Sequence, residues 1–118
     1  MKITLIAERI FDGEYFHQDV PVTVEDGHIL AFDTVVGAKE IRQAGTLVPG
    51  FIDVQVNGGG GALFNADPSV NCIETIGRAH ARFGTTGFLP TLITDDVSVM
   101  ANAADAVAEA LVKGSAGV

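Results

Sequence analysis

Residues 47–61 read LVPGFIDVQVNGGGG, which joins a short apolar strand to a run of four glycines. The stretch from Phe51 to Val56 has the composition of a buried strand, and glycine allows backbone conformations that other residues avoid. Because side chains alternate along a strand, one face is polar and the other is apolar. The polar face holds Asp53, Gln55 and Asn57. The apolar face, which we expect to be packed, holds Ile52, Val54 and Val56.

The end of this strand is the candidate binding site. In parallel sheets and barrels, ligands bind at the carboxyl ends of the strands. If the strand lies in such a sheet, its last side chains and the glycines that follow border a ligand. The predicted substrate or active-site neighbourhood therefore consists of Gln55, Asn57, Gly58 and Gly59.

Composition and charge exclude several classes of protein. The 118 residues include 7 basic and 15 acidic side chains, a net charge of -8, which argues against a nucleic-acid partner. A single cysteine, Cys72, permits neither an intrachain disulfide nor a cysteine-based metal site and favours a reducing, cytoplasmic location. Charged residues from Glu8 onward interrupt the apolar amino terminus, so we expect no signal sequence and no membrane attachment.

Residues 1–48 predict a small unit of β-strands. Strands are expected at 3–7, 20–25 and 28–32, with a short one at 46–48. Asp26-Gly27 is a strong turn signal, so the second and third of these strands should form a hairpin.

Residues 49–118 show a different order: strand, loop, helix, strand, helix, which is typical of parallel βα units. Asp67 is the expected N-cap of the first helix, which should end at Gly84. A second strand is expected at 86–94, and a second helix from Asp95 or Asp96 to Gly114. The apolar stripe of that helix is predicted to be Val97, Met100, Ala101, Ala104, Val107, Ala108 and Leu111.

Two parallel strands do not make a self-sufficient parallel sheet. A complete (β/α)8 barrel takes roughly 250 residues, whereas 68 follow Gly50. We therefore expect either a fragment or a protein that other copies complete, and not a stable monomer with a cooperative melt.

Two segments carry a resemblance to a known family. VPGFIDVQVNGGGG at 48–61 and TTGFLPTLIT at 85–94 resemble the amino-terminal part of the N-acetylglucosamine-6-phosphate deacetylases, a family of the amidohydrolase superfamily. The resemblance implies an α/β fold in two parts. A small β-sandwich segment would span 1–48, and the first two βα units of an incomplete, metal-dependent-hydrolase TIM barrel would span 49–118.

The resemblance also bears on metal binding. Most amidohydrolases carry His-x-His where this chain has Gln55 and Asn57. Amides are poor ligands for a transition metal, so the resemblance implies one divalent metal, of zinc or iron type, instead of two. The two amides would orient water or substrate, or would merely satisfy backbone groups in the barrel mouth. The family's metal ligands and its acid–base aspartate would lie beyond Val118, which leaves no catalytic residue and no metal ligand within this chain.

The activity implied by the resemblance is that of a hydrolase in amino-sugar catabolism. It would convert N-acetylglucosamine 6-phosphate to glucosamine 6-phosphate and acetate, in a homo-oligomer, expected to be a dimer. The chain alone should be inactive. Two alternatives stay open: a non-catalytic fragment or assembly module, and another amidohydrolase such as a dihydroorotase or hydantoinase. The three histidines, His17, His28 and His80, share no ligand spacing and are expected to be structural or solvated.

Overall fold

The computed structural model describes residues 1–115 and divides the chain into two compact units, with the boundary between Pro49 and Gly50. The change of sequence pattern predicts the boundary one residue earlier. We call the first part unit 1 and the second part unit 2.

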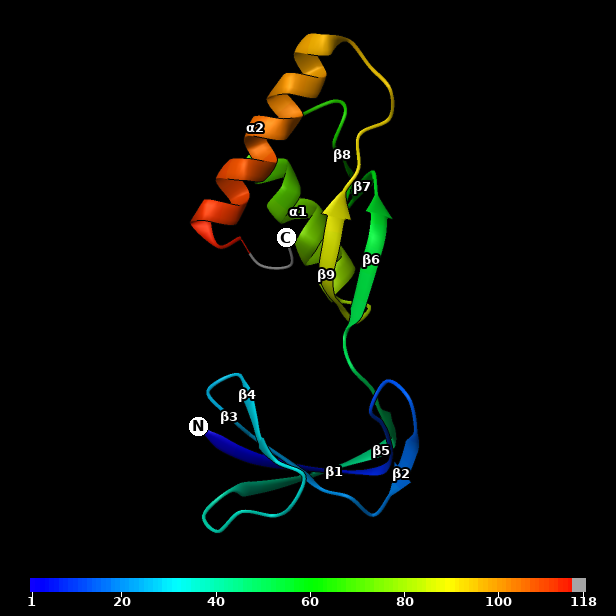
Figure 1. The fold of residues 1–118 in the computed structure, drawn as a ribbon, viewed down its shortest axis with the longest axis vertical. Helices are drawn as coiled ribbons and strands as arrows, with labels where there is room; N and C mark the ends of the chain where they lie inside the picture. The colour runs from blue at the N-terminus through cyan, green and yellow to red at the C-terminus, as the bar shows by residue number, and fades with distance from the viewer. Residues whose placement is uncertain (116–118) are drawn as a thin grey trace. The chain divides into compact units, whose positions relative to one another are not determined.

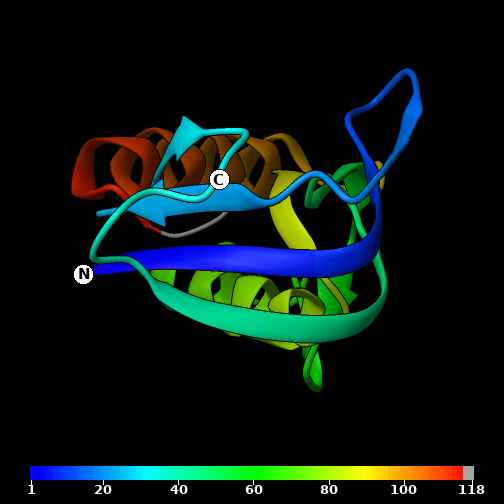
Figure 2. The same ribbon diagram turned by 90° about the horizontal axis from the view of Figure 1, so that it is seen from below.

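Unit 1 is one five-stranded sheet. Its strands are β1 (Lys2–Phe11), β2 (Phe16–Gln18), β3 (Val22–Glu25), β4 (His28–Ala31) and β5 (Lys39–Leu47). The strand β1 is antiparallel to β2 and β3 and parallel to β5, and Figure 2 shows it between β3 and β5. Within the described residues these strands form a single sheet, in which the ten-residue β1 pairs with three other strands. The sandwich implied by the resemblance stays a prediction.

The turn between β3 and β4 has the geometry that its sequence predicts. The two strands pair antiparallel, which confirms the hairpin. Asp26 (φ 50°) and Gly27 (φ 81°) both lie in the left-handed region, as a two-residue hairpin turn of the primed type requires. The strand β5 is much longer than the predicted 46–48. Its sequence KEIRQAGTL is mostly polar and exposed, so it lacks the apolar alternation by which a half-buried strand is recognised.

Unit 2 is an α/β unit built on two parallel strands. The strand β6 (Phe51–Val56) pairs with β9 (Thr85–Pro90), and a small hairpin of β7 (Gly58–Gly59) and β8 (Ala62–Leu63) follows β6 (Figure 1). The helix α1 (Val70–Ala81) connects the parallel strands, and α2 (Val97–Lys113) follows β9. The predicted order of elements is therefore confirmed.

Three ends of helices and strands in unit 2 can be compared with the ends that the sequence predicts. Ser69, and not Asp67, is the N-cap of α1, because its Oγ accepts a hydrogen bond from the Cys72 amide at 3.2 Å. The strand β9 ends at Pro90 instead of continuing to residue 94, and residues 91–96 are irregular. The helix α2 ends at Gly114 in the left-handed conformation (φ 71°), as its sequence predicts.

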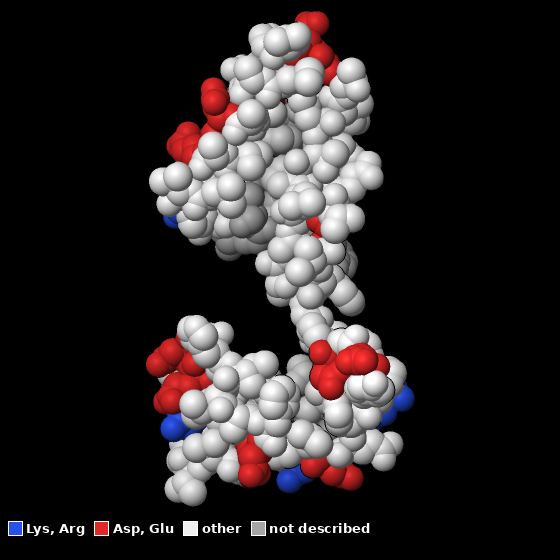
Figure 3. Space-filling model, viewed as in Figure 1, with Lys and Arg blue, Asp and Glu red and all other residues white. Residues whose placement is uncertain are grey.

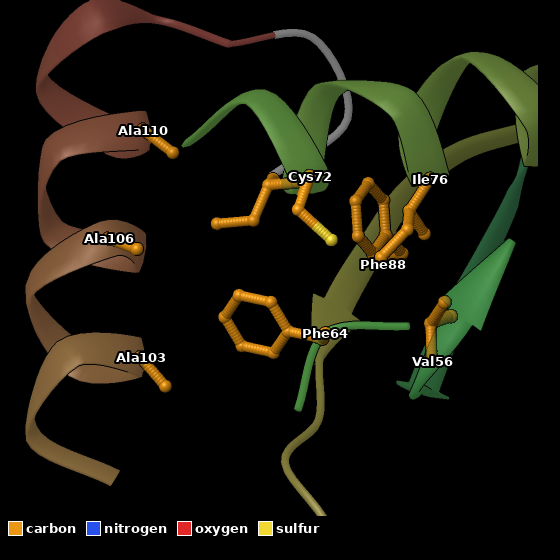
Figure 4. Packing of buried hydrophobic residues seen from close by; sticks show 9 residues of the cluster. Val56, Phe64, Cys72, Ile76, Phe88, Ala103, Ala106 and Ala110 are labelled. Carbon is orange, nitrogen blue, oxygen red and sulfur yellow. The ribbon is translucent and has the colours of Figure 1, made fainter. Parts of the chain in front are cut away.

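The core of unit 2 lies between the two helices and the strands (Figure 4). Phe64, from the loop after β8, is 1% exposed and points into this core. The helix α2 contributes Ala103, Ala106 and Ala110, whereas Val97 and Leu111 are 81% and 58% exposed. Of the predicted apolar stripe, Val107 is partly buried against the core, but the other six residues are exposed, so most of the stripe is wrong. The fully buried residues of the helix are three alanines, and not its valines or its leucine.

The apolar face of β6 is packed only at its end. Val56 is buried, but Ile52 and Val54 are 73% and 70% exposed, so the expectation that all three pack is wrong. The pairing of β6 with β9 shifts register between Asp53 and Val56, which breaks the strict alternation of faces. The helix α1 contacts β7, β8 and β9, and in residues 1–115 β9 is the single strand beside β6.

The charge of the chain is dispersed. On the face shown in Figure 3, acidic side chains are scattered over both units and basic ones are few. Within the described residues, no helix is long and apolar enough to cross a membrane.

Candidate functional site

The candidate site lies at the carboxyl edge of the two parallel strands. Because β6 and β9 run in the same direction, the segments that follow them meet at one edge (Figure 1). After β6 come Asn57 and the glycines of the β7–β8 hairpin. After β9 comes the irregular segment 91–96.

Asn57 connects these two segments. Its side-chain Nδ2 donates a hydrogen bond to the carbonyl oxygen of Thr91 at 2.8 Å. Its backbone oxygen accepts a hydrogen bond from the Phe64 amide, also at 2.8 Å. The sequence leaves two roles open for Asn57: orienting water or substrate, and hydrogen bonding to backbone groups. The hydrogen bond to Thr91 corresponds to the second role. Contact of Asn57 with a ligand stays a prediction.

Gln55 differs from Asn57 in its surroundings. Its side chain is exposed and makes no hydrogen bond to another described residue, while its backbone amide donates to Asp53 Oδ1 at 3.1 Å. The Asp53 carboxylate therefore accepts a hydrogen bond from the backbone of its own strand. Gln55 presents a free donor and acceptor at the edge where a ligand is expected, and that role stays a prediction.

Two of the four glycines leave no room for a side chain. A Cβ on Gly58 would lie 2.5 Å from the Ala62 carbonyl oxygen, and one on Gly59 would lie 2.8 Å from His80 Nε2. The His80 ring is 3.0 Å from the Gly58 carbonyl oxygen, so α1 supports the loop directly. His80 thus has a structural contact, as expected.

The other two histidines lie in unit 1. The Nε2 of His17 is 2.6 Å from Asp12 Oδ2, and the Nδ1 of His28 is 3.0 Å from the Asp26 carbonyl oxygen. Both rings are at least partly exposed and each has a local partner. These local contacts fit the expectation that both histidines are structural or solvated.

Residues 1–115 hold no group of three or more histidine, cysteine, aspartate or glutamate side chains that could bind a metal ion. At the end of β6 the side-chain donors are amides, and the Nδ2 of Asn57 is already committed to Thr91. This donor set does not fit a transition metal by itself. Cys72 is buried, and burial raises the pKa of its thiol.

Asn65 is a residue of this edge that the sequence interpretation missed. Its Nδ2 donates to the Ile93 carbonyl oxygen at 2.8 Å and to Asp95 Oδ2 at 2.9 Å. Its Oδ1 accepts from the Ile93 amide at 2.9 Å. Hydrogen bonds from Asn65 and then from the Asp96 amide lower the pKa of Asp95. The only signal in the sequence was an asparagine in the loop that follows the glycines.

This chain is similar to deacetylases of amino-sugar phosphates. The chain is 47% identical over 97 residues to the N-acetylgalactosamine-6-phosphate deacetylase of Shewanella sp. (strain ANA-3), covering 76% of this chain and 25% of that protein. It is 39% identical over 85 residues to the N-acetylglucosamine-6-phosphate deacetylase of Haemophilus influenzae, covering 72% and 20%. No protein-family model matches the chain.

A solved structure shares the fold. The N-acetylglucosamine-6-phosphate deacetylase from Pasteurella multocida superposes with a TM-score of 0.87 at 30% identity, over 96% of this chain and 31% of that one. The chain spans about a quarter of the length of the curated Shewanella relative. It resembles the amino-terminal portion of N-acetylglucosamine-6-phosphate and N-acetylgalactosamine-6-phosphate deacetylases, which confirms the resemblance inferred from residues 48–61 and 85–94.

Proposed function

We propose that this chain supplies the amino-terminal part of an N-acetylhexosamine-6-phosphate deacetylase. The reaction is hydrolysis of the N-acetyl group of N-acetylglucosamine 6-phosphate, which gives glucosamine 6-phosphate and acetate in amino-sugar catabolism. The observation that supports this most directly is the fold match over 96% of the chain to a deacetylase of that name. The carboxyl edge of β6 and β9, with Gln55 exposed there, is the part of this chain that would border the substrate.

In this proposal the chain shapes the site and does not perform the chemistry. The two strands of unit 2 are the first two of a TIM barrel, and the single divalent metal, of zinc or iron type, is held by residues outside this chain. The side-chain amides at the end of β6 contribute hydrogen bonds to the site, and the glycines contribute to its shape. The whole enzyme is cytoplasmic and dimeric, and the 118-residue chain alone releases no acetate.

A second candidate substrate has a specific observation in its favour. Identity to the Shewanella N-acetylgalactosamine enzyme is 47%, against 39% for the Haemophilus N-acetylglucosamine enzyme. N-acetylgalactosamine 6-phosphate is therefore the competing substrate. The two sugars differ in the orientation of one hydroxyl, which a site distinguishes by hydrogen bonds placed for one orientation.

A chimera tests the proposal. This chain replaces the matching amino-terminal segment of the Shewanella deacetylase, and acetate release is measured with both sugar phosphates. We expect kcat/KM within about tenfold of the parent enzyme on at least one of them, a change of about 1.4 kcal/mol or less. The variant Gln55→Ala should lower kcat/KM further. A folded chimera that releases acetate from neither substrate would contradict the proposal and favour an assembly module or another amidohydrolase.

A further inference from the structure

Asn65 makes an unusually complete set of contacts for a loop residue. Its one side-chain amide forms three hydrogen bonds, of 2.8, 2.9 and 2.9 Å, and all three reach the segment that follows β9. The amide both donates to and accepts from the backbone of Ile93, as a neighbouring strand would. It therefore continues, through a side chain, the pairing between the two segments after β9 has ended at Pro90.

A second amide holds the other end of the same segment. Asn57 donates to the Thr91 carbonyl oxygen at 2.8 Å, and the Thr91 amide donates to the Val56 carbonyl oxygen at 2.8 Å. The segment 91–95 is thus held at its start by Asn57 and near its end by Asn65. Both asparagines belong to the part of the chain that follows β6, and both are half-buried.

The carboxylate of Asp95 takes part in the same set of hydrogen bonds. Its Oδ2 accepts from Asn65, and its Oδ1 accepts from the Asp96 amide at 2.8 Å, directly before α2 begins. A hydrogen bond to a carboxylate is stronger than one between neutral groups. The amide of Asn65 therefore ties the loop after β6 to the start of α2 as well as to the backbone of segment 91–95.

We propose that Asn65 is a positioning residue that, together with Asn57, locks segment 91–95 against the loop after β6, so that the two loops form one wall of the substrate site. The proposal rests on the proposed deacetylase function for its consequence, but not for its geometry. Neither asparagine has to touch the reacting atoms. Their effect is to keep the backbone of Thr91 to Asp95 in one position relative to Gln55 and the glycines.

The lock is tested by hydrogen–deuterium exchange on the chimeric deacetylase that carries this chain as its amino-terminal segment. Asn65→Ala removes all three hydrogen bonds, and Asn65→Asp places a carboxylate against the Ile93 carbonyl oxygen and Asp95. We expect exchange of the Thr91 and Ile93 amides, which donate to the Val56 carbonyl oxygen and to Asn65 Oδ1, to become about tenfold faster or more in Asn65→Ala and faster still in Asn65→Asp. Asn102→Ala, on the exposed face of α2, is the matched control and should leave these two amides unchanged. Equal exchange in Asn65→Ala and the unsubstituted chimera would overturn the lock, as would unprotected Thr91 and Ile93 amides in the unsubstituted chimera.

The positioning role is tested in the chimeric deacetylase. Asn65→Ala should lower kcat/KM about tenfold to a hundredfold, whereas Asn102→Ala should not change it. Adding Asp95→Ala to Asn65→Ala should cost less than Asp95→Ala does alone, because the two residues act through one contact. An unchanged kcat/KM in Asn65→Ala would overturn the role. If the unsubstituted chimera is inactive while exchange at 91–96 still depends on Asn65, the lock is supported and the deacetylase function is refuted.

Discussion

Replacing Gly58 by alanine should destabilise the chain because the new methyl group meets backbone. The added Cβ would lie 2.5 Å from the Ala62 carbonyl oxygen and 3.3 Å from the Leu63 Cα, both in the paired strand β8. Backbone cannot swing aside as a flexible side chain can, so the β7–β8 hairpin has to open. Overpacking costs about 1–3 kcal/mol, and each lost hydrogen bond costs about 0.5–1.5 kcal/mol. The sum predicts a loss of roughly 2–4 kcal/mol in the free energy of unfolding.

Gly87→Ala is the matched control. Gly87 also lies in a strand, but its new Cβ would be 3.7 Å from the nearest atom, a side-chain carbon of Ile52, which is ordinary contact distance. Removing a strand glycine that has room for a side chain should stabilise by about 0.5–1 kcal/mol. Urea unfolding of the chimera, followed by circular dichroism, measures both variants. For a slope of about 1–3 kcal/mol per molar urea, the midpoints should differ by roughly 1–5 M. A midpoint for Gly58→Ala equal to or above that of Gly87→Ala would refute the reasoning.

Three further outcomes follow from individual contacts. Phe64→Ala should lower the free energy of unfolding by about 3–5 kcal/mol in the same urea assay, whereas Leu63→Ala, at a half-exposed neighbour, should cost much less. Hydrogen bonds from the Tyr15 amide, His17 and the Glu14 amide lower the pKa of Asp12 from 3.8 to about 2. The stability that the Asp12 carboxylate contributes to the fold is therefore present above pH 3.8 and is lost as the pH falls through 2. In an NMR titration, His17→Ala should raise this pKa but leave it below 3.8, because the two amides remain; a full return to 3.8 would contradict the assignment. Lys113→Ala should raise the pKa of Glu74, which Lys113 lowers through a hydrogen bond of 2.7 Å, and an unchanged titration would argue against that contact.

Much of the fold could be predicted from the sequence because local signals are strong where they exist. Asp26-Gly27 marks a two-residue turn, and Gly114 marks the end of a helix, since few residues other than glycine adopt the left-handed conformation readily. The buried face of α2 could not be predicted. Hydrophobicity favours its valines and leucine, but the residues that the helix buries are Ala103, Ala106 and Ala110.

Only part of the candidate site could be predicted from the sequence, for a similar reason. Gln55 and Asn57 stand out because they occupy alternate positions at the end of an apolar strand. Asn65 makes its contacts with Ile93 and Asp95, which are 28 and 30 residues further along the chain. No local pattern encodes a contact between two loops, so such a residue becomes apparent only when both strands have been placed side by side.

The burial of Cys72 has a practical consequence for experiments on this protein. It is the only cysteine, it is 2% exposed, and its raised pKa keeps the thiol protonated near neutral pH. A cysteine introduced at Val112, which is 91% exposed near the end of α2, would then be the one accessible thiol of this chain. A maleimide dye added without denaturant would attach at that position alone. Single-molecule fluorescence could therefore be applied without first removing the native thiol.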